Sequence, residues 1–293
     1  MSIAEMIGKE NIAKGRYWRL PWSLVLGCTR CSPGCDHCWA LAMEKRFGGR
    51  EDDFMPGQFH PGEVRVHPER LDIPLKRKKP TVWAIWNDLF HKDVPWRFVD
   101  DALAIMGCCE SPDMRKHIFL VLTKRSQRML NHARHRQENC MVWPPNVWAG
   151  VTVCNQSEAD EKIPIMLQIP AAVRWVSIEP MLGPMDIKKY LCSHANCEDW
   201  GLCHGNHRNL CAQNGMISWV VLGGETGLGA RPMHPDWVRS VRDQCQAAGV
   251  PFFFKGMLLD KKKKTLYLDG RTHLEVPNAI QGQGSSEGKK QRA

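Results

Sequence analysis

The sequence predicts an α/β protein whose parallel strands form a partial or full (β/α) barrel. Short apolar runs rich in Val, Ile and Trp alternate with longer segments of helical pattern, which is typical of repeated βαβ units. Seven such runs occur, each followed by a connection long enough for a helix. The chain has 293 residues and 43% hydrophobic content, enough to bury an ordinary core. An open doubly wound sheet is the alternative.

The elements follow from these patterns in chain order. Runs too short and too apolar for surface helices predict strands at residues 23–27, 81–86, 118–122, 147–152, 173–178, 217–223 and 250–254. Amphipathic periodicity predicts helices at residues 96–108, 125–137, 158–167 and 236–248. The last of these begins after Pro235 and ends at Gly249, before Pro251.

Two segments break the alternation. Residues 192–214 are rich in Cys, His, Asn and Gly and are interpreted as an insertion on a loop. Residues 281–293 consist mainly of Gly, Ser, Lys and Gln, a composition that predicts a disordered tail. We therefore expect one barrel domain over residues 1–280, with the insertion inside it.

Composition restricts the class of protein. Thirteen cysteines, an odd number, favour metal binding or reactive chemistry in a reducing compartment over a disulfide framework. A net charge of +9 favours an anionic partner, most simply nucleic acid, although lysine runs such as 76–79 and 261–264 are also typical of solvated loops. No apolar stretch approaches the ~20 residues of a membrane span, and the first residues lack the apolar core of a secretory signal. We expect a cytoplasmic protein without membrane contact.

Four cysteines fall within eleven positions directly after the first predicted strand. Pro33 and Gly34 prevent a helix there, so the loop curls and brings several sulfurs toward one centre. Soft thiolates in a tight loop suit an iron–sulfur cluster or zinc. The four are Cys28, Cys31, Cys35 and Cys38.

The spacing from Cys31 is C-x3-C-x2-C followed by Trp39, the common pattern of radical S-adenosylmethionine enzymes. Three cysteine ligands leave one iron of a [4Fe–4S] cluster open to the amino and carboxylate groups of S-adenosylmethionine. Either Cys28 or Cys31 is then not a ligand. The alternative is a four-cysteine zinc knuckle, but the position after a first barrel strand favours an active-site loop.

Polar residues follow the predicted strands where they end, the edge at which parallel barrels gather their catalytic groups. Each alone is more often a cap or an ion pair, but together they predict one shared cavity. The predicted catalytic residues are Glu179, Glu225, Lys255 and Asp88. The predicted cofactor-binding residues are Asn87, Asp88, Thr123, Lys124, Thr152, Gly223, Gly224 and Glu225.

Gly223, Gly224 and Glu225 are similar to the motif that holds the methionine ammonium in radical S-adenosylmethionine enzymes, but they follow the sixth strand rather than the second. Asn87 or Asp88 is the alternative for that role, which leaves Glu225 for the substrate. Four cations are candidates for a substrate phosphate or the S-adenosylmethionine carboxylate. Their alternative role is ion pairing with Glu179, Glu225 and Asp88; the four are Lys124, Arg125, Arg231 and Lys255.

The insertion carries a second candidate metal site for zinc or another cluster, although its spacings match no standard finger. Its cysteines are Cys192, Cys197, Cys203 and Cys211, interleaved with His194, His204 and His207. The alternative is a loop with unpaired thiols. The remaining cysteines are predicted to be buried small hydrophobes; they are Cys108, Cys109, Cys140, Cys154 and Cys245.

Several ordered blocks carry a resemblance to a known family. They include GCT at 27–29, SPGC at 32–35, NDLFH at 87–91, LTKR at 122–125, GVTV at 150–153, EPMLGP at 179–184, GGE at 223–225 and LDGR at 268–271. With these blocks the chain resembles, nearly end to end, the phage-associated radical-SAM-like proteins of uncharacterised function. The resemblance implies the cluster spacing C-x6-C-x2-C, so that Cys28, Cys35 and Cys38 are the ligands, with Cys31 as the alternative to Cys28.

The resemblance also implies a radical-SAM type barrel that forms a 5′-deoxyadenosyl radical, in a phage-encoded protein of the host cytoplasm. The basic charge and the phage setting together predict modification or rearrangement of a hypermodified pyrimidine base in DNA, flipped into the barrel mouth. A flavodoxin or ferredoxin is the expected electron donor. The alternatives are a DNA repair lyase similar to spore photoproduct lyase and a non-enzymatic zinc protein that binds nucleic acid.

Overall fold

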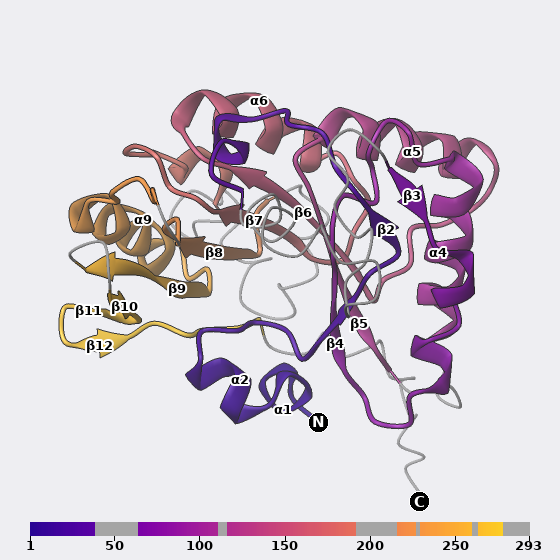
Figure 1. The fold of residues 1–293 in the computed structure, drawn as a ribbon, viewed down its shortest axis with the longest axis horizontal. Coiled ribbons are helices and arrows are strands. Elements are labelled where there is room, and N and C mark those ends of the chain that lie inside the picture. Colours follow the sequence, from indigo (N-terminus) through magenta and orange to yellow (C-terminus); the bar gives the residue numbers. More distant parts are fainter. Residues whose placement is uncertain (39–63, 111–115, 192–215, 227–228, 260–262, 278–293) are drawn as a thin grey trace, which may run out of the picture.

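The computed structural model describes residues 1–38, 64–110, 116–191, 216–226, 229–259 and 263–277 (Figure 1). Its centre is an eight-stranded sheet in the order β1-β4-β5-β6-β7-β8-β9-β10. Neighbouring strands from β1 to β9 are parallel, and only β10 pairs antiparallel. The strands are β1 Leu20–Trp22, β4 Val82–Ile85, β5 Ile118–Thr123, β6 Val147–Val153, β7 Arg174–Ile178, β8 Trp219–Gly223, β9 Phe252–Leu259 and β10 Lys263–Thr265.

The parallel strands lie in the same order in the sheet as in the chain, without the reversal that defines a doubly wound sheet. Since right-handed crossovers then place every connecting helix on one face, the helices form a single outer layer, as Figure 1 shows. Within the described residues, β1 and β10 are the two edges of the sheet and no pairing closes it. The outer helices are α4 Trp96–Cys108, α5 Ser126–Glu138, α6 Gln156–Met166 and α9 Pro235–Ala247.

Smaller elements complete the described part of the chain. At the amino terminus come α1 Ile3–Ile7 and α2 Lys9–Ala13, and the short helical turns are η1 Pro33–Cys35, η2 Pro68–Arg70, η3 Pro74–Lys76 and η4 Lys188–Tyr190. The two small sheets pair β2 Val25–Leu26 with β3 Arg65–Val66, and β11 Tyr267–Leu268 with β12 Arg271–Thr272. In the part of the chain that the structure describes, no helix is both long and apolar enough to cross a membrane.

The four predicted helices and six of the seven predicted strands are confirmed, with small shifts at their ends. The prediction of one sheet strand at 23–27 is wrong. The chain leaves the large sheet after Trp22, because Arg70 donates to the Ser23 carbonyl over 3.1 Å and the Trp22 indole donates to the Arg70 carbonyl over 2.8 Å. The next residues then pair antiparallel with β3 instead.

The inner face of the sheet, opposite the outer helices, changes character along the strands. Toward the amino-terminal ends it is packed with aromatic rings, among them the buried Trp148, Trp175 and Trp219, against which α1 also packs. A Cβ at Gly150 would lie 2.4 Å from the Trp175 ring, so only glycine leaves room for this ring beside β6. This layer closes one end of the inner face, and the polar residues begin beyond it.

Three of the five remaining cysteines agree with the prediction of burial: Cys109, Cys154 and Cys245. The prediction is wrong for Cys108 and Cys140, which are exposed. Cys108 is the last residue of α4, and Cys140 lies just beyond α5 with a positive φ of 57°. Both thus lie at helix ends, where the apolar period of the helix no longer directs a side chain to the core.

Candidate functional site

The structure places the predicted polar residues along one edge of the sheet. Thr123 is the last residue of β5 and is in register with β6, Glu179 directly follows β7, and Gly223 ends β8. Lys255 lies within β9, next to the residue in register with Gly223. Because all these strands are parallel, their carboxyl ends and the residues that follow them form one rim.

Asp88 and Arg125 form a buried ion pair on this rim, with 2.5 Å between Arg125 Nη1 and Asp88 Oδ2. The other carboxylate oxygen of Asp88 accepts the Thr123 hydroxyl over 2.6 Å and the Phe90 backbone N–H over 3.0 Å. Only 14% of the Arg125 side chain and 9% of the Asp88 side chain are exposed. Both oxygens of the Asp88 carboxylate are therefore bonded within the protein, and one of them holds the Arg125 guanidinium in place.

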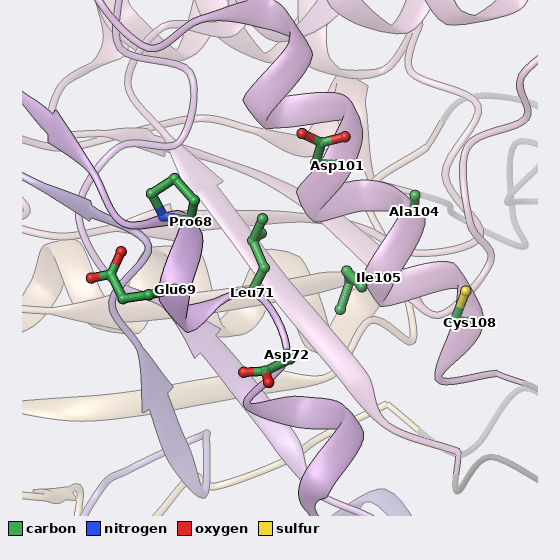
Figure 2. Close-up of a pocket in the computed structure, with 8 residues that line it drawn as sticks. All are labelled: Pro68, Glu69, Leu71, Asp72, Asp101, Ala104, Ile105 and Cys108. Atoms are coloured by element: carbon green, nitrogen blue, oxygen red, sulfur yellow. The ribbon is translucent and has the colours of Figure 1, made fainter.

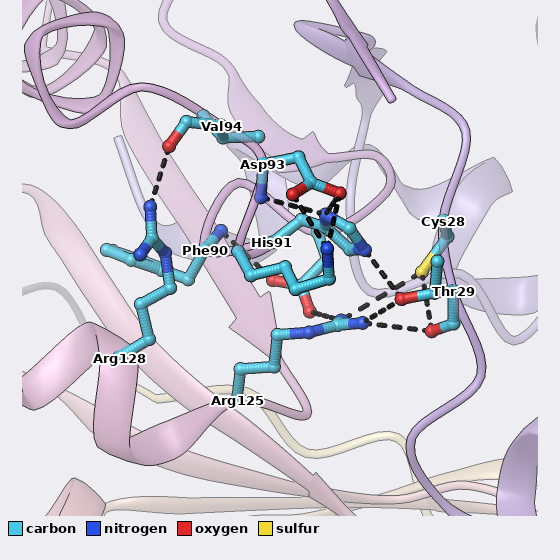
Figure 3. Close-up of polar contacts among 10 residues, drawn as sticks. Cys28, Thr29, Phe90, His91, Asp93, Val94, Arg125 and Arg128 are labelled. Carbon is cyan, nitrogen blue, oxygen red and sulfur yellow. Dashed lines mark hydrogen bonds and ion pairs between the residues drawn. The ribbon is translucent and has the colours of Figure 1, made fainter. Parts of the chain in front are cut away.

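The same guanidinium holds the start of the cysteine loop. Arg125 Nη2 donates to the Thr29 carbonyl over 2.9 Å and to its hydroxyl over 3.0 Å, and Nη1 lies 4.0 Å from Cys28 Sγ. The buried His91 ring accepts the Asp93 backbone N–H at Nδ1, so its Nε2 carries the proton that it donates to the Thr29 hydroxyl over 2.7 Å. Figure 3 shows these contacts converging on Thr29 from two segments.

Asn87 supports the loop from its base. Its side-chain amide donates to the Val25 carbonyl over 2.6 Å, and its backbone has a positive φ of 61°. Asparagine is one of the few residues that adopt this conformation readily, since its short amide bonds to nearby backbone. Asn87 therefore joins the end of β4 to β2, the strand that precedes the cysteines.

A second ion pair holds the later half of the cysteine loop. Arg231 contacts both Glu225 oxygens through its side chain and also donates its backbone N–H to Oε2 over 2.8 Å. The same guanidinium donates to the Pro33 carbonyl over 2.8 Å and lies 3.5 Å from the Asp36 carboxylate. Burial raises the pKa of Glu225, but the bonds from Arg231 lower it by more, so the carboxyl remains ionised.

A third support reaches the loop from α6. Ser32 caps the short turn η1 by accepting the Gly34 N–H over 3.1 Å, and its hydroxyl lies 3.7 Å from the buried Cys154 thiol. This thiol donates over 3.0 Å to Glu158, which is paired with Lys162 at 2.5 Å. Burial and the Glu158 carboxylate raise the pKa of Cys154 to about 11, so the thiol keeps its proton and its role as a donor.

Lys255 and Glu179 form a third ion pair, on the inner face. Lys255 Nζ lies 2.6 and 2.5 Å from the two Glu179 oxygens and 5.2 Å from the centre of the Tyr17 ring. Burial lowers the pKa of Lys255, but the Glu179 carboxylate raises it by more, so the ammonium stays charged. Burial raises the pKa of Tyr17 to about 12, which keeps its hydroxyl neutral.

Three of the four candidate cations thus pair with Asp88, Glu225 and Glu179, as the ion-pair alternative predicted. Within the described residues the fourth, Lys124, has no carboxylate within ion-pair distance, and its charge acts on Cys35. Thr152 is buried in β6, and Gly223 packs against Lys255 and Glu179, where a Cβ would meet the Lys255 Cβ at 3.2 Å.

The cysteine sulfurs differ in their surroundings. Cys35 is buried, Cys28 and Cys38 are half-buried, and Cys31 is exposed. The Cys31 thiol donates to Cys35, which lowers the pKa of Cys35 and raises that of Cys31. Burial and Asp88 raise the pKa of Cys28, against the lowering effect of Arg125.

The cysteine donors of this loop suit a cluster better than a single metal ion. Among the described residues, no three His, Cys, Asp or Glu side chains converge closely enough to hold a single metal ion. A cubane cluster is larger than one ion, and its cysteine ligands bind different irons, so their sulfurs need not converge on one point. Soft thiolates beside Lys124 and Arg125 fit such an anionic group. Cys192, Cys197, Cys203 and Cys211 lie outside the described residues.

The groove in Figure 2 lies on the outer side, between α4 and the turns η2 and η3, and not at the rim. It has a volume of about 550 Å³. Its walls combine Leu71 and Ile105 with the carboxylates of Glu69, Asp72 and Asp101. It contains none of the predicted site residues, which lie at the rim.

Several residues of the site were missed by the sequence interpretation. Thr29, His91, Ser32, Asp36 and Glu158 contact or support the loop, but none was assigned a role. Thr29, Ser32 and His91 belong to the resemblance blocks GCT, SPGC and NDLFH, which was the available signal.

These features define an α/β protein with a mostly parallel sheet, unclosed within the described residues, and a cysteine loop between two arginine–carboxylate pairs. Residues 14–277 match the model of a family described as protein of unknown function (DUF5131). The chain belongs to this family. No curated protein matches the chain, and no solved structure does.

Proposed function

We propose that this protein binds a [4Fe–4S] cluster through Cys28, Cys35 and Cys38 and uses it with S-adenosylmethionine for radical chemistry. The observation that carries the proposal is the double attachment of the cysteine loop, to Arg125 on one side and to Arg231 on the other. Both arginines are held by carboxylates that are themselves buried. Such a frame would hold the cysteine sulfurs in fixed positions for a cluster.

The finer fold that we propose is a partial barrel of the radical-SAM type. Its support is the sequential order of seven parallel strands, with helices on one face and a polar rim at the carboxyl ends. The aromatic layer around Trp175 fills the amino-terminal end of the inner face. A ligand would therefore enter from the rim, where the cysteine loop lies.

When bound, such a cluster supplies the electron that converts S-adenosylmethionine into a 5′-deoxyadenosyl radical. Lys124, without a carboxylate partner among the described residues, is the cation that we assign to the S-adenosylmethionine carboxylate. Asp88 and Glu225 act as positioning residues, since each holds the arginine that holds the loop. Gly223 and Gly224 let protein groups pack closely on the backbone, Lys255 and Glu179 at the first position and Met233 and Met257 at the second, so we assign them to shaping the rim.

Lys255 and Glu179 lie further along the inner face and are assigned to the substrate. The charged Lys255 ammonium holds Glu179 in its ionised form, and together they offer a donor and an acceptor in a shielded place. The substrate class that we propose is a pyrimidine base of phage DNA, hypermodified and flipped out of its stack. The net charge of +9 supports an anionic substrate. The protein would act in the host cytoplasm, with a flavodoxin or ferredoxin as electron donor.

The test is anaerobic purification followed by three measurements. We expect a brown protein with about four iron and four sulfide per chain, and 5′-deoxyadenosine after addition of dithionite and S-adenosylmethionine. Cys35→Ala removes a ligand that the C-x3-C-x2-C and C-x6-C-x2-C spacings share, and this variant should lose the colour, the iron and sulfide, and the 5′-deoxyadenosine. The matched control is Cys245→Ala, at a buried cysteine of α9, which should change none of the three. A colourless wild-type protein with stoichiometric zinc would contradict the proposal and favour a zinc protein.

A further inference from the structure

Two further cations lie beside the Lys255–Glu179 pair. Lys264 is an exposed residue of β10, the strand that pairs antiparallel with β9. Gly256, with a φ of +106°, follows Lys255 in β9, and a Cβ there would lie 2.9 Å from Lys264 Cε. The Lys264 stem therefore crosses the backbone directly next to Lys255, over a position that has no side chain.

Arg16 comes from the segment before β1. A Cβ at Gly15 would lie 3.2 Å from the Lys255 carbonyl oxygen, so this segment runs against β9. The exposed Arg16 guanidinium lies over the Trp18 ring, 5.7 Å from its centre. A cation–π contact of this kind uses none of the guanidinium N–H donors, so these stay available to an anion.

Positive charge exceeds negative charge around the Lys255–Glu179 pair. Both Glu179 oxygens are bonded to Lys255, and neither Arg16 nor Lys264 has a carboxylate within ion-pair distance among the described residues. Burial lowers the pKa of Lys264, and the charges of Lys255 and Arg16 lower it further, with Glu179 in opposition. Like charges held together in this way are relieved by binding an anion.

We propose that Arg16 and Lys264 form a phosphate-binding site that holds a nucleotide next to the Lys255–Glu179 pair. Arg16 provides a planar fork of donors and Lys264 a mobile point charge, a combination suited to a phosphate diester or monoester. This inference rests on the proposed function only in taking the substrate to be a nucleotide. It makes no use of the cluster.

The experiment measures binding of a fluorescein-labelled single-stranded DNA oligomer to the full chain by fluorescence anisotropy, at several salt concentrations. The variants are Arg16→Gln, Lys264→Gln and the double variant, and the control is Lys188→Gln, an exposed lysine of η4. Each single variant should weaken binding roughly fivefold and reduce the salt slope by about 0.7. The control should behave as the wild type.

Competition with unlabelled ligands identifies the group that is bound. A nucleoside monophosphate should displace the oligomer from the wild type, and the same nucleoside without phosphate should displace it far less. The inference is overturned if Arg16→Gln and Lys264→Gln bind as Lys188→Gln does, or if the wild type binds neither oligomer nor monophosphate. Either result leaves the iron and 5′-deoxyadenosine measurements unaffected, so the two proposals fail separately.

Discussion

The two arginine–carboxylate pairs that hold the cysteine loop differ in burial. In the Arg125–Asp88 pair the side chains are 14% and 9% exposed, and in the Arg231–Glu225 pair they are 29% and 4% exposed. Arg125 contacts the loop before Cys31, and Arg231 contacts it at Pro33 and Asp36. The Arg125–Asp88 pair thus joins the core to the start of the loop. The Arg231–Glu225 pair holds the later part of the loop through the more exposed of the two arginines.

Because of this difference in burial, the two pairs should differ in how much each contributes to the stability of the fold and to the position of the loop. Removing one partner of a buried pair leaves a charge without water or counterion and is strongly destabilising. Around a more exposed arginine, water replaces part of what is lost. We therefore expect changes at Asp88 to act on the stability of the fold, and changes at Arg231 to act mainly on the loop.

The largest effect is expected for Asp88→Ala. This variant leaves the Arg125 guanidinium buried without its carboxylate, and the bonds from Thr123 and Phe90 are also lost. The free energy of unfolding, measured by urea denaturation, should fall by about 3–5 kcal/mol. Asp88→Asn keeps the shape and part of the bonding, and should lose less. A loss below about 1 kcal/mol for Asp88→Ala would show that Arg125 is solvated.

Glu225→Gln should have an intermediate effect that depends on pH. The pKa of Glu225 is lowered from its ordinary value of 4.5 in the folded protein, because the bonds from Arg231 outweigh burial. Its contribution to stability is therefore complete above the unfolded pKa and is lost as the pH falls through the folded pKa. Urea denaturation at pH 7 should show a loss of about 1–2 kcal/mol, and this difference from the wild type should shrink below pH 4.5. A difference that is constant with pH argues against an ionised Glu225.

Arg231→Gln should change the stability less and the loop more. The variant removes the donors to the Pro33 carbonyl and Asp36, so the turn around Cys35 loses its outer attachment. In metal-free protein the buried Cys35 should react faster with a thiol reagent. The free energy of unfolding should fall by about 1 kcal/mol, because the buried Glu225 carboxylate keeps the bond from the backbone N–H of residue 231. Arg239→Gln, at an exposed surface pair, is the matched control. Equal thiol reaction rates in the two variants would sink this account of Arg231.

The smallest effect is expected for Ser32→Ala. The hydroxyl caps a single short turn by accepting the Gly34 N–H, and the capped segment is only three residues long. Loss of a cap costs about 0.5–1 kcal/mol, which a shift of the urea midpoint should show. Cys154→Ala removes the thiol next to this hydroxyl and tests whether the α6 support contributes separately. If Ser32→Ala costs as much as Asp88→Ala, the order of the supports is wrong.

The sequence predicted most of the sheet because alternating apolar runs and amphipathic helices are local signals. It failed at 23–27, since the partner of Val25 is Val66, some forty residues away, and no local pattern specifies that pairing. The polar residues of the rim were also found from their places at strand ends. Their partners were left open, because a pair such as Arg231 and Pro33 is 198 residues apart and forms only in the folded chain. Thr29 and His91 were missed because their bonds to each other likewise depend on the fold.

The most direct test of the central claim is the iron content of four single variants purified without oxygen. The account predicts that Cys28→Ala, Cys35→Ala and Cys38→Ala lose the cluster absorbance and most of the iron. Cys31→Ala, which removes the exposed thiol, should keep about four iron per chain. Full iron in Cys28→Ala together with its loss in Cys31→Ala would move the third ligand to Cys31. Iron at background level in the wild type itself would contradict the cluster.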